Sequence, residues 1–241
     1  IEYIKKIKKN FSKVIYFDDS AAISHILFFI VPHVDSYWVR GLFKDTNLYS
    51  KSFYGGRSYS DYYNKKYNIK DEKTYLSPKY NGKFPKNIKI AWNIGIGCFP
   101  TPERNLLNYY YSNFRKISCG LAMLSNIKIL SFIIDKYINE MINILSEDIN
   151  LLEKRRLISA RFSSENYYKS IGFHRELVKD KILNNNLFIK GKTSKWNYIK
   201  ECNSIYALLS PFGWGEIGAR DFEIFVNGSL LIKPDMSHLE T

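Results

Sequence analysis

The sequence predicts an α/β protein whose parallel β-sheets are flanked by helices. Three observations lead to this class. Short runs of β-forming residues recur along the chain, the second half alternates such runs with segments of helical spacing, and loops rich in Gly or Ser join them. Strands that alternate with helices at this pace form βαβ units, and these units place the strands of a sheet in parallel.

The second half shows the alternation most clearly. We expect strands at 156–162, 187–189, 205–209 and 230–232, and helices at 165–183, 194–202 and 217–227. On the first of these helices, the spacing places Tyr167, Ile171, His174, Val178 and Ile182 on one face. A histidine on an apolar face indicates a packed, hydrogen-bonded core residue more than a phosphate contact.

The first half is less regular. It predicts strands at 13–17, 26–30 and 88–92, an aromatic-rich segment at 35–67 with a turn at Gly55-Gly56, and two helices between 118 and 152. We therefore expect one unit at 1–150 and a second at 151–241. The chain begins at Ile1 and stops just after a segment that reads as structured, so we expect a piece of a longer chain with both units incomplete.

Composition limits the function classes. The 241 residues are 45% hydrophobic and 16% aromatic, which is enough for a sizeable core, and the formal net charge is +13. Such a charge suits nucleic acid, an anionic membrane surface or a phosphorylated ligand, but here it is dispersed in a chain rich in Lys, Asn, Ile and Tyr. Three widely spaced cysteines and no clean apolar run of about 20 residues predict a soluble cytoplasmic protein, with peripheral membrane association left open.

The stretch SPFGWGEIGARDFEIFVNGSLLI, residues 210–232, lies at a predicted strand–loop–helix junction. In parallel sheets, ligands bind beyond the carboxyl ends of the strands. Gly213 and Gly215 allow close approach of a ligand, and Gly218 falls in the first predicted helical turn. The helix start suits a phosphate, and Glu223 is placed to accept ribose hydroxyls. The alternatives are an ordinary tight turn and an i, i+4 ion pair of Arg220 with Glu216.

Residues 210–238 resemble the donor-binding segment of glycosyltransferases with the GT-B fold, in particular bacterial and viral family 1-like or exostosin-like enzymes. The resemblance implies two Rossmann-like domains and a nucleotide-sugar co-substrate with no further cofactor. It implies donor contacts by Gly213, Trp214, Gly215, Glu216, Arg220 and Glu223. The family motif separates two glutamates by seven residues, whereas six separate Glu216 and Glu223 here, so the assignment is firmer for Glu223.

Two further sets of residues are candidates for this chemistry. Arg161, near the end of the first strand of the second half, and Lys233, just past the last strand, would stabilise a pyrophosphate leaving group unless they are surface cations. Asp18 and Asp19 follow a strand and are candidates for the base that deprotonates the acceptor, although such a pair is also an ordinary loop or cap; His33 and Asp35 are weaker. No Asp-X-Asp element sits at a strand end, so we expect no metal.

The sequence thus predicts a metal-independent transferase that moves a sugar from a nucleoside-diphosphate donor to a hydroxyl of a glycan, lipid or protein. Acceptor binding falls to Trp38 and residues 54–63 of the aromatic-rich first half. Two alternatives remain. One is a basic nucleic-acid-binding module, and the other is a relic of the same fold that binds nucleotide or sugar without catalysis.

Overall fold

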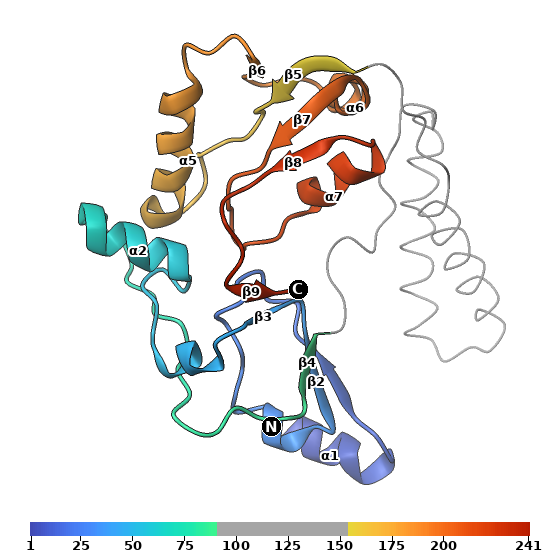
Figure 1. Ribbon diagram of the computed structural model, residues 1–241. Coiled ribbons are helices and arrows are strands. Elements are labelled where there is room, and N and C mark those ends of the chain that lie inside the picture. Colours follow the sequence, from blue (N-terminus) through green and yellow to red (C-terminus); the bar gives the residue numbers. More distant parts are fainter. Residues whose placement is uncertain (91–153) are drawn as a thin grey trace, which may run out of the picture.

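The computed structural model describes residues 1–90 and 154–241, which form two parallel sheets flanked by helices (Figure 1). The first sheet has the order β1-β2-β4, from Ile15–Phe17, Ser36–Val39 and Ile88–Ile90. The second has the order β6-β5-β7-β8, from Phe188–Ile189, Arg155–Ser159, Ile205–Leu209 and Leu230–Ile232. Every neighbouring pair in both sheets is parallel. The predicted α/β class is therefore confirmed for the described residues.

Helices cover both faces of the second sheet. Helix α5 (Lys169–Ile182) packs on one face, and α6 (Lys195–Ser204) and α7 (Ala219–Val226) pack on the other (Figure 1). The alternation of side chains along β7 explains this layering, because Leu208 joins the α6/α7 core while its neighbour Leu209 joins the α5 core. No helix in the described part of the chain is long and apolar enough to cross a membrane.

The order of strands in the second sheet creates a crevice. From β5 the chain passes to β6 on one side and then returns to β7 on the other side of β5. The connections after β5 and β7 therefore diverge in opposite directions at the carboxyl edge of the sheet. In doubly wound sheets, such a switch point is where ligands bind.

The first half is built around buried aromatic residues. Tyr37, Phe43 and Tyr49 are almost fully buried, and the rings of Phe43 and Tyr49 lie 5.2 Å apart. Its other elements are helix α1 (Glu2–Asn10), helix α2 (Ser58–Tyr67), two 3₁₀ turns (η1, Val31–His33, and η2, Thr46–Ser50) and strand β3 (Leu42–Phe43). The chain returns at its end to pair β9 (Leu239–Glu240) with β3 in antiparallel fashion, between the two sheets (Figure 1).

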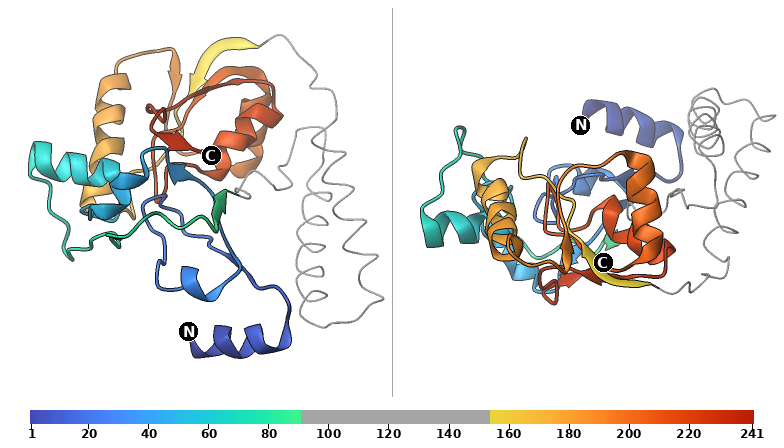
Figure 2. Two further views of the ribbon diagram at one scale, coloured as in Figure 1. Left: turned by 60° about the horizontal axis from the view of Figure 1, so that its bottom comes forward. Right: turned by 90° about the horizontal axis from the view of Figure 1, so that it is seen from above.

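Helix α2 joins the two halves, because it lies beside α5 in every view (Figure 2). The ring of Tyr63 on α2 lies 5.7 Å from that of Phe173 on α5. Just beyond α2, the carboxylate of Asp71 accepts hydrogen bonds from the backbone N–H of Ser170 at 2.8 Å and from its hydroxyl at 2.6 Å. These contacts fix α5 against the first half.

Several predicted boundaries were wrong. Residues 26–30 form no strand, because successive turns bend the backbone there, with Phe28 N–H donating to Ile26 O at 3.0 Å and Ile30 N–H to Leu27 O at 2.8 Å. Helix α5 begins at Lys169 instead of 165, after Asn166 adopts a φ of 65° that a helix does not tolerate. Helix α7 begins at Ala219, so Gly218 is its N-cap. The helices predicted between 118 and 152 lie outside the described residues.

Candidate functional site

The loop from Ser210 to Gly218 leads from β7 to α7 at the carboxyl edge of the second sheet, next to the switch point. Its first residue, Ser210, is fixed by hydrogen bonds to β8 and α7. Ser210 N–H donates to Ile232 O of β8 at 2.8 Å, and the Ser210 hydroxyl donates to Asp221 Oδ1 at 2.6 Å. The glycine-rich loop therefore starts from a rigid strand end, as the sequence predicts for a ligand-binding loop.

A hollow of about 340 Å³ lies against this loop, and we call it the loop cavity. Residues from both halves of the chain line it. They include Ala21, Arg40, Tyr167, Arg175, Arg220 and Lys233 in addition to the loop itself. Four of these are cations, and none of the described residues that line the cavity is a carboxylate. The cavity is therefore electropositive.

Among the described residues, no carboxylate pairs with two of these cations, Arg175 and Arg220. Arg175 is buried, and its guanidinium donates to the carbonyl oxygens of Ser163, Pro211 (3.2 Å) and Phe212 (2.7 Å). Burial lowers the pKa of Arg175 from its usual value. The Arg220 guanidinium donates to the carbonyl of Arg161 and lies 5.6 Å from the centroid of the Tyr198 ring. Both side chains are held in place by neutral groups, which leaves their charge for an anion.

Lys233 differs from these arginines, because it forms an ion pair with Asp221 at 2.8 Å, and both side chains are largely buried. Burial lowers the pKa of Lys233 despite this partner. Asp221 Oδ2 also accepts the N–H of Gly218 at 3.0 Å. The pair therefore fixes the start of α7 against the end of β8, and Lys233 adds less net charge to the cavity than the arginines do.

The start of α7 points into the loop cavity. Gly218, Ala219 and Arg220 all line it. The N–H of Gly218 is bound to Asp221, and the N–H of Asp221 bonds back to Gly218 O at 3.0 Å. The N–H groups of Ala219 and Arg220 are the remaining donors of this helical turn, since the first turn of a helix has no internal acceptors. Together with the arginines, they suit an anionic ligand.

Glu216 does not line the loop cavity, contrary to its predicted role as a donor contact. Its side chain is 0% exposed, and Oε2 accepts the N–H of Ile23 from the first half at 3.1 Å. Oε1 is buried without a partner among the described residues, and burial raises the pKa of this carboxyl. Beside it, a Cβ on Gly215 would lie 1.9 Å from the carbonyl oxygen of Ala21. Glu216 and Gly215 therefore lock the loop onto the first half.

The other predicted loop residues lie at or near the cavity. Gly213 and Trp214 line it, and the Trp214 side chain is 41% exposed. Glu223 lines neither the loop cavity nor the cavity described next; its Oε2 accepts a hydrogen bond from the Tyr198 hydroxyl at 3.0 Å. The ribose contact of Glu223 stays a prediction.

A larger hollow of about 690 Å³ adjoins the ends of β5 and β6, and we call it the strand-end cavity. Arg161, Lys179, Lys190, Lys192, Tyr198 and Arg220 line it together with apolar residues. Arg220 lines both cavities, so the two hollows share this residue. A ligand with an anionic part and a larger, partly apolar part could therefore occupy both.

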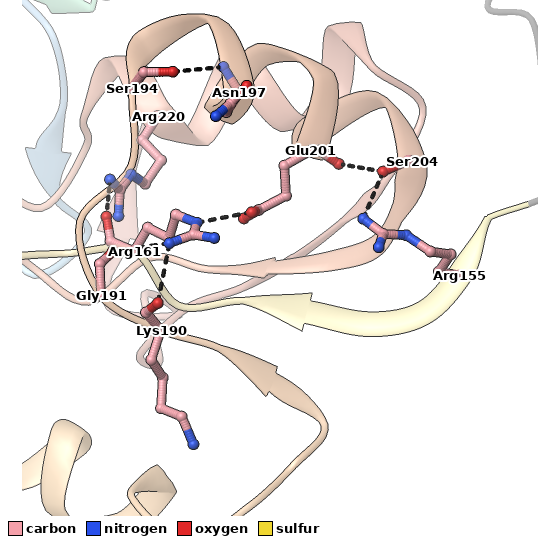
Figure 3. A network of polar contacts seen from close by, with 9 residues as sticks. All are labelled: Arg155, Arg161, Lys190, Gly191, Ser194, Asn197, Glu201, Ser204 and Arg220. Atoms are coloured by element: carbon pink, nitrogen blue, oxygen red, sulfur yellow. Dashed lines mark hydrogen bonds and ion pairs between the residues drawn. The ribbon is translucent and has the colours of Figure 1, made fainter.

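Arg161 anchors the wall of the strand-end cavity (Figure 3). Its Nε donates to Glu201 Oε2 at 2.7 Å, and Nη1 donates to the carbonyl oxygens of Lys190 at 3.0 Å and Gly191 at 3.1 Å. Arg161 forms an ion pair with the buried Glu201, which neutralises its charge. Arg161 therefore fits its predicted contact with a leaving group poorly. The predicted phosphate role fits Arg220 better, because no carboxylate among the described residues pairs with it.

Neither predicted base, Asp18 or Asp19, lines the loop cavity, so their catalytic role stays a prediction. The buried Asp18 accepts hydrogen bonds from the Tyr37 hydroxyl and from Ser20 N–H, the latter at 2.9 Å, and the exposed Asp19 pairs with Arg40. The weaker candidate Asp35 accepts Val14 N–H at 2.7 Å. None of these carboxylates lines the loop cavity. Within the described residues, no group of three or more His, Cys, Asp or Glu side chains could hold a metal ion.

The core role of His174 is confirmed. It is buried, its Nδ1 lies 2.9 Å from the Tyr63 hydroxyl, and desolvation lowers its pKa to about 4. Its neighbour Arg175 is the functional candidate that sequence reasoning missed. The signal available in the sequence was an arginine in a helix that faces a sheet. If such an arginine is buried, its charge requires an anion or several carbonyl groups as partners.

Comparison with known proteins gives no relative. No protein-family model matches the chain, and no curated protein or solved structure matches it significantly.

Proposed function

We propose that the protein is a glycosyltransferase of the GT-B type and that the loop cavity binds the diphosphate of a nucleoside-diphosphate sugar. One observation carries the proposal. At the switch point of a parallel sheet, Arg175 and Arg220 meet the start of α7, and no described carboxylate pairs with either arginine. Guanidinium groups and helix-start N–H groups bind diphosphates well. The resemblance of residues 210–238 to the donor segment of these enzymes supports the same assignment.

The adjoining cavities suit the two ends of such a donor. With the diphosphate in the loop cavity, the nucleoside enters the strand-end cavity past Arg220, which lines both. That cavity combines apolar walls at Phe162 and Ile182 with the ring of Tyr198, as nucleoside pockets do. Glu223 lines neither cavity and accepts a hydrogen bond from Tyr198; it stays our candidate for the ribose hydroxyls on the sequence resemblance alone.

Transfer breaks the bond between the anomeric carbon and the diphosphate oxygen and forms a bond from that carbon to the acceptor oxygen. Negative charge develops on the departing diphosphate, and Arg175 and Arg220 stabilise it without a metal ion. The proton of the acceptor hydroxyl passes to a base, which we leave unassigned because Asp18 and Asp19 are engaged elsewhere. In this proposal the two sheets belong to two Rossmann-like units, with the acceptor on the side of the first.

A thermal-shift panel with UDP, GDP, CMP and ADP at two salt concentrations tests the donor site. A nucleotide at about 100 times its dissociation constant adds about 2.7 kcal/mol of stability, so one nucleoside diphosphate should give a clear shift. Arg220→Gln should weaken the binding of that diphosphate about tenfold and leave the binding of its nucleoside unchanged. Arg155→Gln is the matched control, because Arg155 is exposed and contacts the Ser204 hydroxyl at 2.9 Å, away from both cavities.

Two outcomes would contradict the proposal. Strongly salt-dependent binding of oligonucleotides with no preference among nucleotides would favour a nucleic-acid-binding module. Nucleotide binding without release of nucleoside diphosphate from any nucleotide-sugar, across a panel of sugar acceptors, would favour a non-catalytic relic of the fold.

A further inference from the structure

A third hollow, of about 260 Å³, lies on the other side of Trp214 from the loop cavity. We call it the aromatic cavity. Its walls are the segment Ser20–Ala22, the side chains of His25, Tyr75, Tyr168 and Trp214, and the pair Gly56-Arg57. It shares Ala21 and Trp214 with the loop cavity, so its occupant would lie beside a diphosphate bound there.

The aromatic rings of this cavity are exposed, although rings of this size are usually buried. Tyr75, Tyr168 and Trp214 are 39%, 46% and 41% exposed. Tyr168 and Trp214 meet edge to face, with centroids 5.2 Å apart and an interplanar angle of 85°. The Tyr75 ring lies directly on Gly56, where a Cβ would come within 2.4 Å of it and where φ is +73°. The backbone therefore makes room for a flat ring that faces solvent, as in sites that bind sugar rings.

Arg57 gives the cavity a fixed cation. Its Nε donates to Trp214 O at 2.6 Å, its Nη1 donates to Gly55 O at 2.6 Å, and the guanidinium carbon lies 5.5 Å from the centroid of the Trp214 ring. Nη2 has no hydrogen-bond partner within residues 1–90 and 154–241, and none of the described residues that line the cavity is a carboxylate. A guanidinium held by two carbonyl groups is preorganised for a carboxylate.

The remaining wall is polar, with Ser20, His25 and Tyr75 side chains in contact with one another. His25 Nε2 lies 2.9 Å from the Tyr75 hydroxyl, and Nδ1 lies 3.5 Å from the Ser20 hydroxyl. Each of these three groups both donates and accepts hydrogen bonds, as neighbouring hydroxyls of a sugar do. The cavity thus presents two exposed aromatic rings nearly at right angles, a wall of groups that donate and accept hydrogen bonds, and one cation.

We infer that the aromatic cavity binds a pyranose ring that carries a carboxylate. The ring lies against Trp214 and Tyr168, and the carboxylate lies at Arg57. The volume of about 260 Å³ suits one such ring. The inference rests on the proposed function, because it makes an acidic sugar the acceptor-side ligand of that same site.

Ligand-observed NMR titration of methyl β-D-glucuronide and of methyl β-D-glucoside tests this inference directly. We expect the glucuronide to bind about tenfold more tightly, because a charge-assisted hydrogen bond to Arg57 is available only to the carboxylate. Arg57→Gln should remove this preference, and Arg57→Lys should retain part of it. Tyr168→Ala should weaken both sugars, because it removes one wall; its side chain makes no hydrogen bond at the start of α5.

Matched controls are Arg155→Gln for the charge and Tyr206→Ala for the ring, since Tyr206 is exposed on β7 and lines no cavity described above. Neither control should change the affinity for either sugar. The shift with the nucleoside diphosphate reports that each variant is folded. Equal affinity for the two sugars, a preference that survives Arg57→Gln, or displacement of the glucuronide by a single-stranded oligonucleotide would overturn the inference.

The same data separate this inference from the proposed function. A nucleotide shift without sugar binding refutes the acidic-sugar site and leaves the donor site standing. Glucuronide binding that depends on Arg57, without a shift from any nucleotide, supports the sugar site and refutes the donor site.

Discussion

Replacing Gly215 by alanine should destabilise the protein strongly, because the new methyl group has no space. The Cβ would lie 1.9 Å from Ala21 O and 2.6 Å from Ala21 C, and both are backbone atoms that no rotamer change can move. The loop and the segment at Ala21 must therefore separate by about 1.5 Å to reach ordinary contact. That displacement stretches the bond from Ile23 N–H to Glu216 Oε2, which is 3.1 Å long in the native protein.

Two costs add up in this variant. Overpacking costs about 1–3 kcal/mol, and leaving the Ile23 amide and the Glu216 carboxyl unpaired costs about 1–3 kcal/mol more. We expect a loss of about 2–6 kcal/mol, which urea unfolding at pH 7 measures as a lower midpoint with an unchanged slope. Gly218→Ala is the matched control, because nothing lies within 4 Å of a Cβ there and the φ of −128° suits any residue. Equal midpoints for the two alanine variants would refute this reasoning.

Two further predictions concern buried polar groups. The pKa of His174 falls from 6.5 to about 4 on folding, so the unfolded chain binds a proton that the folded chain does not. Stability should therefore fall as the pH drops from 6.5 to about 4, by up to about 1.4 kcal/mol per pH unit, and His174→Asn should flatten this slope in urea titrations across that range; an unchanged slope would count against a buried neutral imidazole. Asp221→Asn should cost about 3–5 kcal/mol, because it leaves the buried Lys233 without its partner. The exposed Asp180→Asn should change stability by about 0.5 kcal/mol or less, and similar thermal midpoints for the two variants would show that the pair is not stabilising.

Local sequence patterns found all four strands of the second sheet, although β5 ends at Ser159, three residues before the predicted end. Strands β7 and β8 begin and end where the alternation of β-formers and loops predicted, because each is a short apolar run between polar connections. The helix starts were less predictable. The left-handed conformation of Asn166 delays α5, and no local pattern reveals it before the chain is folded.

The first half was harder to predict because its elements are short and depend on distant partners. Strand β3 has two residues and exists through its pairing with β9 at the other end of the chain. Residues 26–30 have the composition of a strand, but Ile26, Phe28 and Ile30 reach the core from a series of turns. Burial therefore explains the apolar character of these three residues without a strand.

The candidate site likewise depends partly on local sequence and partly on contacts between distant residues. The glycine-rich loop and its position after a strand follow from local sequence. Which arginine is free for a ligand depends on pairings between distant residues, such as Arg161 with Glu201, which lie 40 residues apart. Sequence reasoning therefore found the place and named Arg220 there, but it also assigned Arg161, whose pairing with Glu201 no local pattern reveals.

The lock between the loop and the first half also has a consequence for the order of synthesis. Ile23 and Glu216 are separated by 193 residues. At about 5–20 residues per second, a ribosome needs about 10–40 s to add the second partner after the first. During that time the Ile23 N–H lacks its Glu216 acceptor and has only water as a partner, so this part of the newly made first half stays uncovered until the loop arrives.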